Sequence, residues 1–126
     1  MSSFRFRREE HLKGRNEIRE VFGRGKRFGC RGAKLFVLKN ELPHNRICFT
    51  FSRGFGNAVA RNRSRRISRE AYRHLLPRLS ASAGADGGCD IILQVYPETE
   101  RLFTAGALSD RAGQLEFLFT KAGLLT

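Results

Sequence analysis

The residues of this chain with the clearest chemical meaning are six arginines that stand within residues 60–73. If this stretch is helical, at about 100° per residue, an arc of about 140° holds five arginines and one asparagine. These residues are Arg61, Asn62, Arg65, Arg66, Arg69 and Arg73. The opposite side carries Ala60, Ile67, Ala71 and Leu75. Guanidinium groups stay charged and bind phosphate oxygens in pairs, so this face predicts binding to a nucleic-acid backbone.

The charge of the whole chain supports a polyanionic partner. Residues 1–79 hold 21 Lys and Arg against 6 Asp and Glu, whereas residues 80–126 hold 3 against 6. Glu70 is the only acidic residue within residues 60–73, so ion pairs within the helix cannot neutralise the arginines. A surface charged only for solubility is the less favoured alternative, because acidic residues would serve that purpose equally well.

No residue pattern indicates that the chain alone is an enzyme. Its twelve carboxylates form no tight group for two metal ions, and no serine or cysteine has a nucleophile setting. Residues 53–57 contain two glycines but lack the rest of a phosphate-binding loop. Cys30, Cys48 and Cys89 have no paired spacing, which favours free thiols in a reducing cytoplasm. No apolar run is long enough to span a membrane.

The elements that position the arginines follow from hydropathy patterns. We predict one domain over residues 1–126, with a flexible arm at 1–11 and a loop at 80–88. The predicted order is helix 16–22, strand 35–38, strand 47–51, helix 58–76, strand 90–95 and helix 108–122. Asn57 is expected to cap the arginine helix and Pro77 to end it. The first two strands are expected to form a hairpin through a turn at 40–45, and the last strand to be central.

The arginine segment carries a family resemblance. Residues 56–63 read GNAVARNR, and Arg65-Arg66-Ile67 and Arg69-Glu70-Ala71-Tyr72-Arg73 follow. This sequence resembles the protein subunit of bacterial ribonuclease P. Residues 12–22, 35–38, 48–53 and 90–92 are also similar to that family.

The resemblance implies a fold and a function. The fold is an α/β (α+β) two-layer sandwich with a small mixed central sheet, helices and a left-handed β-α-β crossover, although general handedness rules favour the opposite hand. The function is to assist a catalytic RNA that removes the 5′ leader from precursor tRNA, so the chain acts as part of a ribonucleoprotein endoribonuclease. The RNA and its Mg²⁺ would perform the hydrolysis, with no catalytic residue and no metal held by the protein. The implied partners are the catalytic RNA subunit and precursor tRNA, in the cytoplasm, without a membrane or an obligate protein partner.

The resemblance also assigns residues to two sites. Arg61, Asn62, Arg63, Arg65, Arg66 and Arg69 match the RNA-binding helix of the family, and Arg73 joins them by its place in the arc. Ile18, Phe22 and Phe36 match the cleft that binds the leader, whereas composition alone assigns both phenylalanines to the core. Ser64 and Ser68 stand where apolar residues are common in the family.

Two other functions stay open at this point. One is a ribosomal or chromosomal nucleic-acid-binding protein without an enzymatic role, which would bind duplex DNA and a tRNA precursor equally well. The other is a nuclease made of protein alone, which would cleave RNA without an RNA subunit. The missing carboxylate cluster makes this last function the least favoured.

Overall fold

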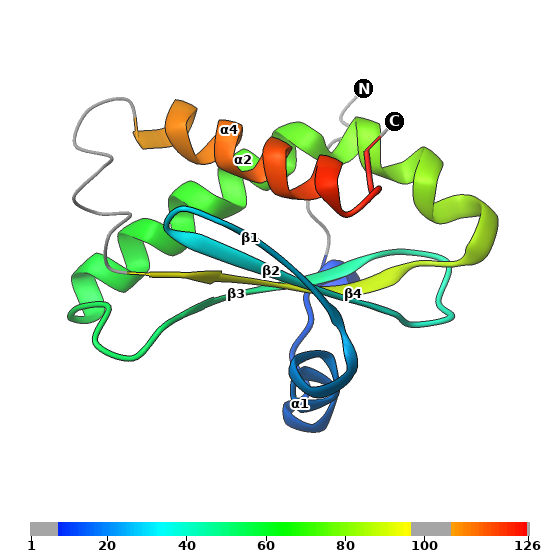
Figure 1. The fold of residues 1–126 in the computed structure, drawn as a ribbon, viewed down its shortest axis with the longest axis horizontal. Coiled ribbons are helices and arrows are strands. Elements are labelled where there is room, and N and C mark those ends of the chain that lie inside the picture. The colour runs from blue at the N-terminus through cyan, green and yellow to red at the C-terminus, as the bar shows by residue number, and fades with distance from the viewer. Residues whose placement is uncertain (1–7, 97–106, 126) are drawn as a thin grey trace.

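The computed structural model describes residues 8–96 and 107–125, apart from the side chains of residues 80–86 and 107–109. The elements in chain order are η1 (Arg8–Glu10), α1 (Arg15–Arg24), β1 (Lys26–Cys30), β2 (Ala33–Lys39), β3 (Arg46–Phe51), α2 (Ala58–Asp86), β4 (Cys89–Val95) and α4 (Ala107–Lys121). Helices α2 and α4 cover one face of the sheet, and α1 lies on the other (Figure 1). The predicted α/β class with a mixed sheet is therefore confirmed.

The sheet has the strand order β1-β2-β4-β3. Strand β2 is antiparallel to both β1 and β4, whereas β3 is parallel to β4. Strand β4 is central, and six of its seven residues are buried because helices cover both faces. The predicted central strand and the β3-α2-β4 unit are confirmed, while the hand of this crossover stays a prediction.

The predicted hairpin between the second and third strands is wrong. Strand β4 lies between β2 and β3, so that Ile92 is flanked by Phe36 on one side and Cys48 on the other. The apolar residues of β4 are buried best with a strand on each edge, and β2 uses its remaining edge for β1. Strand β1 was not predicted, because its five residues include two cations and a glycine without an alternating pattern.

The arginine helix is longer than predicted. Its backbone stays helical through Pro77 to Asp86, so the predicted end at Leu76 and the predicted loop at residues 80–88 are wrong. Pro77 has no N–H group, so only the helical hydrogen bond to the Arg73 carbonyl is lost. Arg73 is an exposed residue, so water can reach this part of the helix. The connection between α2 and β4 therefore consists of only Gly87 and Gly88. A Cβ atom on Gly88 would collide with the carbonyl of His44.

The flexibility predicted for the arm stays a prediction; residues 8–11 of it have defined structure, and residues 1–7 lie outside the described residues. Residues Arg8–Glu10 form a short 3₁₀ helix, and His11 forms a bridge with Ile47. The Leu12 amide donates a hydrogen bond to the Ile47 carbonyl at 2.9 Å, and the Leu12 side chain is buried. This segment therefore runs along the outer edge of β3.

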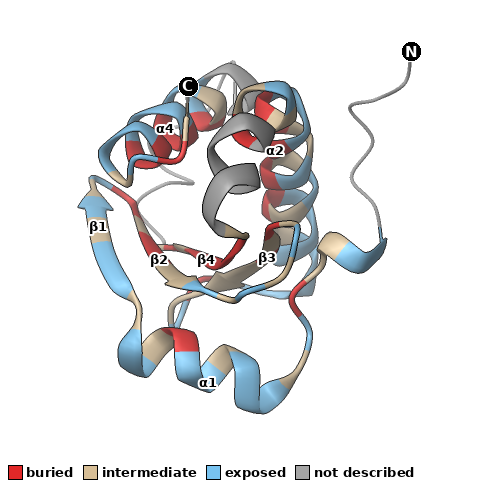
Figure 2. Ribbon diagram, turned by 90° about the vertical axis from the view of Figure 1, so that its right-hand side faces the viewer, coloured by how far each residue is buried: buried red, intermediate tan, exposed pale blue. Residues whose placement is uncertain are grey.

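Two apolar cores lie on the two faces of the sheet. The larger core, between the sheet and helices α2 and α4, includes Leu35, Ile91, Leu93, Tyr72 and Phe119. The smaller core lies under α1 and consists of Leu12, Val21, Phe36 and Ile92. Figure 2 shows that the buried positions of α2 and α4 face inward, whereas much of their outer surface is exposed.

Candidate nucleic-acid interface

The arginine face of α2 begins at a capped helix end. The Asn57 side chain accepts a hydrogen bond from the Ala60 amide at 3.0 Å, which confirms the predicted cap. We call Arg61, Asn62, Arg65, Arg66, Arg69 and Arg73 the cationic ridge. Arg65 is half-buried and the other five are exposed. Arg63, the seventh predicted RNA-binding residue, is also exposed.

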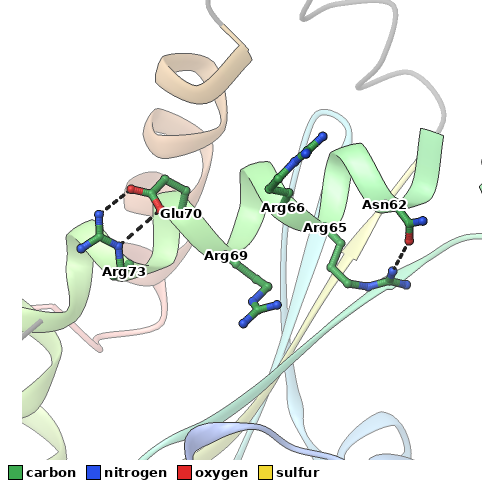
Figure 3. Close-up of a pocket in the computed structure, with 6 residues that line it drawn as sticks. All are labelled: Asn62, Arg65, Arg66, Arg69, Glu70 and Arg73. Atoms are coloured by element: carbon green, nitrogen blue, oxygen red, sulfur yellow. Dashed lines mark hydrogen bonds and ion pairs between the residues drawn. The ribbon is translucent and has the colours of Figure 1, made fainter. Parts of the chain in front are cut away.

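Every residue of the ridge except Arg61 lines an open groove, together with Glu70. Its volume is about 410 Å³, and four arginines, one asparagine and one glutamate line it. In Figure 3, Arg65 and Arg69 extend from one side of α2, and Arg66 and Glu70 from the other. The structure therefore brings these predicted residues together on one helix, as the helical period indicated.

Glu70 is the only acidic residue within residues 60–73, and it lies beside the ridge. Glu70 Oε2 accepts a hydrogen bond from Arg73 Nη2 at 2.6 Å and lies 3.2 Å from His74 Nε2. The hydrogen bond from Arg73 holds the pKa of Glu70 below its usual value. Within residues 8–96 and 107–125, Arg61 and Arg66 form no ion pair with a carboxylate. The charge of the ridge is thus mostly uncompensated by the ridge itself.

The segment before α1 lies beside the cationic ridge. Burial lowers the pKa of His11, and the positive charges of Arg69 and Lys13 lower it further. His11 also pairs with β3, so the ridge, the edge of β3 and the N-terminal segment adjoin one another.

The apolar stripe of α2 is interrupted by two serines with a tertiary role. Ser64 and Ser68 are buried, and both hydroxyls accept hydrogen bonds from Nη1 of the buried Arg111 on α4. These residues join α2 to α4 at the back of the ridge. The sequence showed two polar residues at apolar positions, but it did not identify Arg111 as their partner.

The three residues predicted for a leader-binding cleft form one cluster where α1, which carries Ile18 and Phe22, packs on the sheet, which carries Phe36. Phe22 and Phe36 contact each other edge to face, with ring centroids 4.8 Å apart and an angle of 70°. Phe36 is only 5% exposed, whereas Ile18 and Phe22 are half-buried. The guanidinium of Arg27 lies 5.7 Å from the Phe36 ring centroid. Phe36 thus packs as core, and Phe22 offers the more accessible ring.

A partly buried ion pair joins β3 to β4 on this side of the sheet. The Asp90 carboxylate accepts hydrogen bonds from Arg46 Nε at 2.8 Å and Arg46 Nη2 at 2.7 Å. Asn40 Nδ2 donates to the same carboxylate at 2.8 Å, and Arg46 Nη1 donates to Glu17 of α1 at 3.3 Å. The hydrogen bonds from Arg46 to Asp90 are the main cause of a raised Arg46 pKa. This network was not predicted, because its members are distant in the sequence.

The cysteines and the remaining polar groups give no sign of metal binding. Cys30, Cys48 and Cys89 are free thiols, and burial raises the pKa of Cys48 to about 11. In the part of the chain that the structure describes, no three His, Cys, Asp or Glu side chains gather closely enough to hold a metal ion. Over the same residues, no helix has the length and apolar character needed to cross a bilayer.

Fold and site together define a small α/β protein whose crossover helix carries an exposed cationic ridge. The ribonuclease P family model matches residues 6–121. A ribonuclease P protein component from Borrelia duttonii is 37% identical over 92 residues, which cover 73% of this chain and 76% of that protein. Its counterpart from Borreliella burgdorferi is 42% identical over 79 residues, 61% of this chain and 66% of that relative's length. This chain belongs to the ribonuclease P protein component family.

Solved structures show the same fold. The ribonuclease P protein of Staphylococcus aureus superposes with a TM-score of 0.77 at 19% identity, covering 93% of this chain and 98% of that one. The protein of Thermotoga maritima has a TM-score of 0.71 at 24% identity, covering 86% and 94%. These similarities establish the architecture, while the roles of individual residues are proposed below.

Proposed function

We propose that this chain is the protein subunit of ribonuclease P and binds the catalytic RNA through the cationic ridge. The observation that carries this proposal is the set of exposed arginines on one helix face with Glu70 as the only acid among them. Phosphate contacts of this kind supply affinity and orientation rather than sequence specificity. Family membership supports an RNA partner over duplex DNA.

The reaction assigned to the complex is hydrolytic removal of the 5′ leader from precursor tRNA. The catalytic groups and the Mg²⁺ ions belong to the RNA in this proposal. It is supported by membership of the ribonuclease P protein component family, whose name describes one component of a larger enzyme. The contribution of the protein is to neutralise phosphate repulsion and to hold the RNA and the substrate together.

A reconstitution assay tests this function. The catalytic RNA with this protein is expected to cleave precursor tRNA at a lower Mg²⁺ concentration than the RNA alone, because arginines replace part of the cation requirement. The assay measures cleavage rate against Mg²⁺ for RNA, protein and complex. An unchanged Mg²⁺ requirement, cleavage by purified protein alone, or equal affinity for duplex DNA and precursor tRNA would each contradict the proposal.

The cluster of Ile18, Phe22 and Phe36 is the proposed contact for the leader. Single-stranded nucleotides stack on aromatic rings, and the half-buried Phe22 ring is the accessible one. The buried Phe36 ring packs against the Phe22 ring through the edge-to-face contact. We therefore assign Phe22 to direct contact with the leader and Phe36 mainly to holding Phe22.

Phe22→Ala is expected to weaken binding of precursor tRNA by about tenfold while changing affinity for mature tRNA less than about twofold. The reason is that only the precursor carries the leader. Equilibrium titrations of the reconstituted complex with both tRNAs measure the difference. Phe117→Ala, which removes a 52% exposed ring from α4, is the matched control and should affect neither. Equal losses for the two tRNAs with Phe22→Ala would contradict the assignment.

A further inference from the structure

Arg65 differs from a freely rotating surface arginine because two neighbours hold its guanidinium. Its Nη1 donates a hydrogen bond to Asn62 Oδ1 at 3.0 Å. Its Cζ lies 5.2 Å from the centroid of the Phe51 ring. A guanidinium within about 6 Å of an aromatic face is attracted by the electrons of the ring.

The Phe51 ring is itself held in place. It ends the edge strand β3 and packs against Phe55, with ring centroids 4.7 Å apart and an angle of 43°. Phe55 is 5% exposed, in the turn that leads into α2. The ring is therefore fixed by the sheet and by the turn, and it transmits that order to the side chain that lies over it.

Holding Arg65 in this way preserves its charge. Phe51 and Asn62 are both neutral, so neither cancels the positive charge, whereas Glu70 lies beside Arg73 with its negative charge. An arginine loses much rotamer entropy when it is fixed by a ligand. If the side chain is already ordered, less entropy is lost on binding and the affinity is higher.

We propose that Phe51 is a positioning residue for RNA binding, which orders the Arg65 guanidinium toward a phosphate group of the catalytic RNA. This inference rests on the proposed function, since it names one internal support of the ridge. Phe51 acts through Arg65 and does not itself touch the RNA. The alternating pattern of β3 placed Phe51 on one face of a strand, but only the tertiary structure brings it under an arginine of α2.

A double-mutant cycle tests the proposal. In the otherwise unchanged protein, Phe51→Leu is expected to weaken binding to the catalytic RNA by about three- to tenfold. In an Arg65→Ala background the same change should have an effect below about 1.5-fold, because the group that Phe51 positions is gone. Phe51→Tyr should retain affinity close to the original, because it keeps the ring.

Three further measurements separate positioning from a loss of folding. Phe51→Leu combined with Arg66→Ala should show its full effect, because Arg66 extends from the other side of α2 (Figure 3). The slope of log affinity against log salt should stay unchanged in Phe51→Leu, and fall by about 0.7 to 0.9 in Arg65→Ala, because only the latter removes a phosphate contact. Urea unfolding of each variant gives the folded fraction for correcting affinities.

The outcomes distinguish this inference from the proposed function. If Phe51→Leu weakened RNA affinity by the same factor in the original protein and in the Arg65→Ala variant, the positioning role would be overturned. So would an unchanged affinity of Phe51→Leu where Arg65→Ala weakens binding, although the ridge would then still bind RNA. If the unaltered protein neither binds the catalytic RNA nor lowers its Mg²⁺ requirement, the proposed function itself fails.

Discussion

Arg65→Ala together with Arg69→Ala is expected to weaken binding to the catalytic RNA by at least about 100-fold near physiological salt. In the proposed complex each guanidinium would form a charge-assisted contact with phosphate, worth about 1.5 to 3 kcal/mol. Arg65 and Arg69 extend from the same side of α2, so one RNA backbone can meet both (Figure 3). The slope of log affinity against log salt should also fall by about 1.4 to 1.8, since two phosphate contacts are lost.

A matched pair of substitutions controls for total charge. Arg78→Ala with Lys121→Ala also removes two positive charges, but outside the ridge. Arg78 is on α2, where it pairs with Glu116 of α4, and Lys121 is in the last turn of α4. This variant is expected to lose less than about threefold in affinity, because long-range attraction between exposed charges is screened by salt. If both double variants lost affinity equally, only net charge would matter, and the ridge would have no special place in binding.

Asp90→Ala is expected to lower the free energy of unfolding by about 3 to 5 kcal/mol. The Asp90 side chain is 8% exposed, and its carboxylate receives two hydrogen bonds from Arg46 and one from Asn40. Its removal leaves the Arg46 guanidinium, with a side chain 19% exposed, without its main partner. Urea unfolding followed by circular dichroism measures the change.

Two variants test whether this loss comes from the unpaired charge. Glu17→Gln, which alters the half-exposed carboxylate on α1, should cost less than about 1 kcal/mol because solvent screens that pair. Asp90→Leu with Arg46→Met should recover much of the stability lost in Asp90→Ala, since neither group is then charged. A loss below about 1 kcal/mol for Asp90→Ala would show that solvent reaches Arg46 and that the pair contributes little.

The elements with a strong local pattern were predictable. The arginine face of α2 follows from a helical period of about 3.6 residues, and the cap at Asn57 follows from its side chain. The strand ending in Phe51 alternates, and β4 is almost continuously apolar. Each of these features depends on residues within one or two turns of helix or one strand.

The errors arose where local signals compete. Pro77 and the glycines and serines that follow it favour an end to the helix, but the backbone of α2 continues to Asp86. The turn between β2 and β3 favours a hairpin. Strand β4 nevertheless pairs with both strands, because more of its apolar surface is then removed from contact with water. Such a gain depends on the whole sheet and is absent from any short segment.

The sequence alone determined that this protein has one helix with an arginine face and too few acids to neutralise it, because charge and helical period are local properties. The tertiary structure alone decided what supports that helix: Phe51 under Arg65, and Arg111 bonded to Ser64 and Ser68. It also decided that Phe36 is buried while Phe22 stays accessible. These contacts join residues far apart in the chain, and they depend on how the sheet and helices pack together to exclude water.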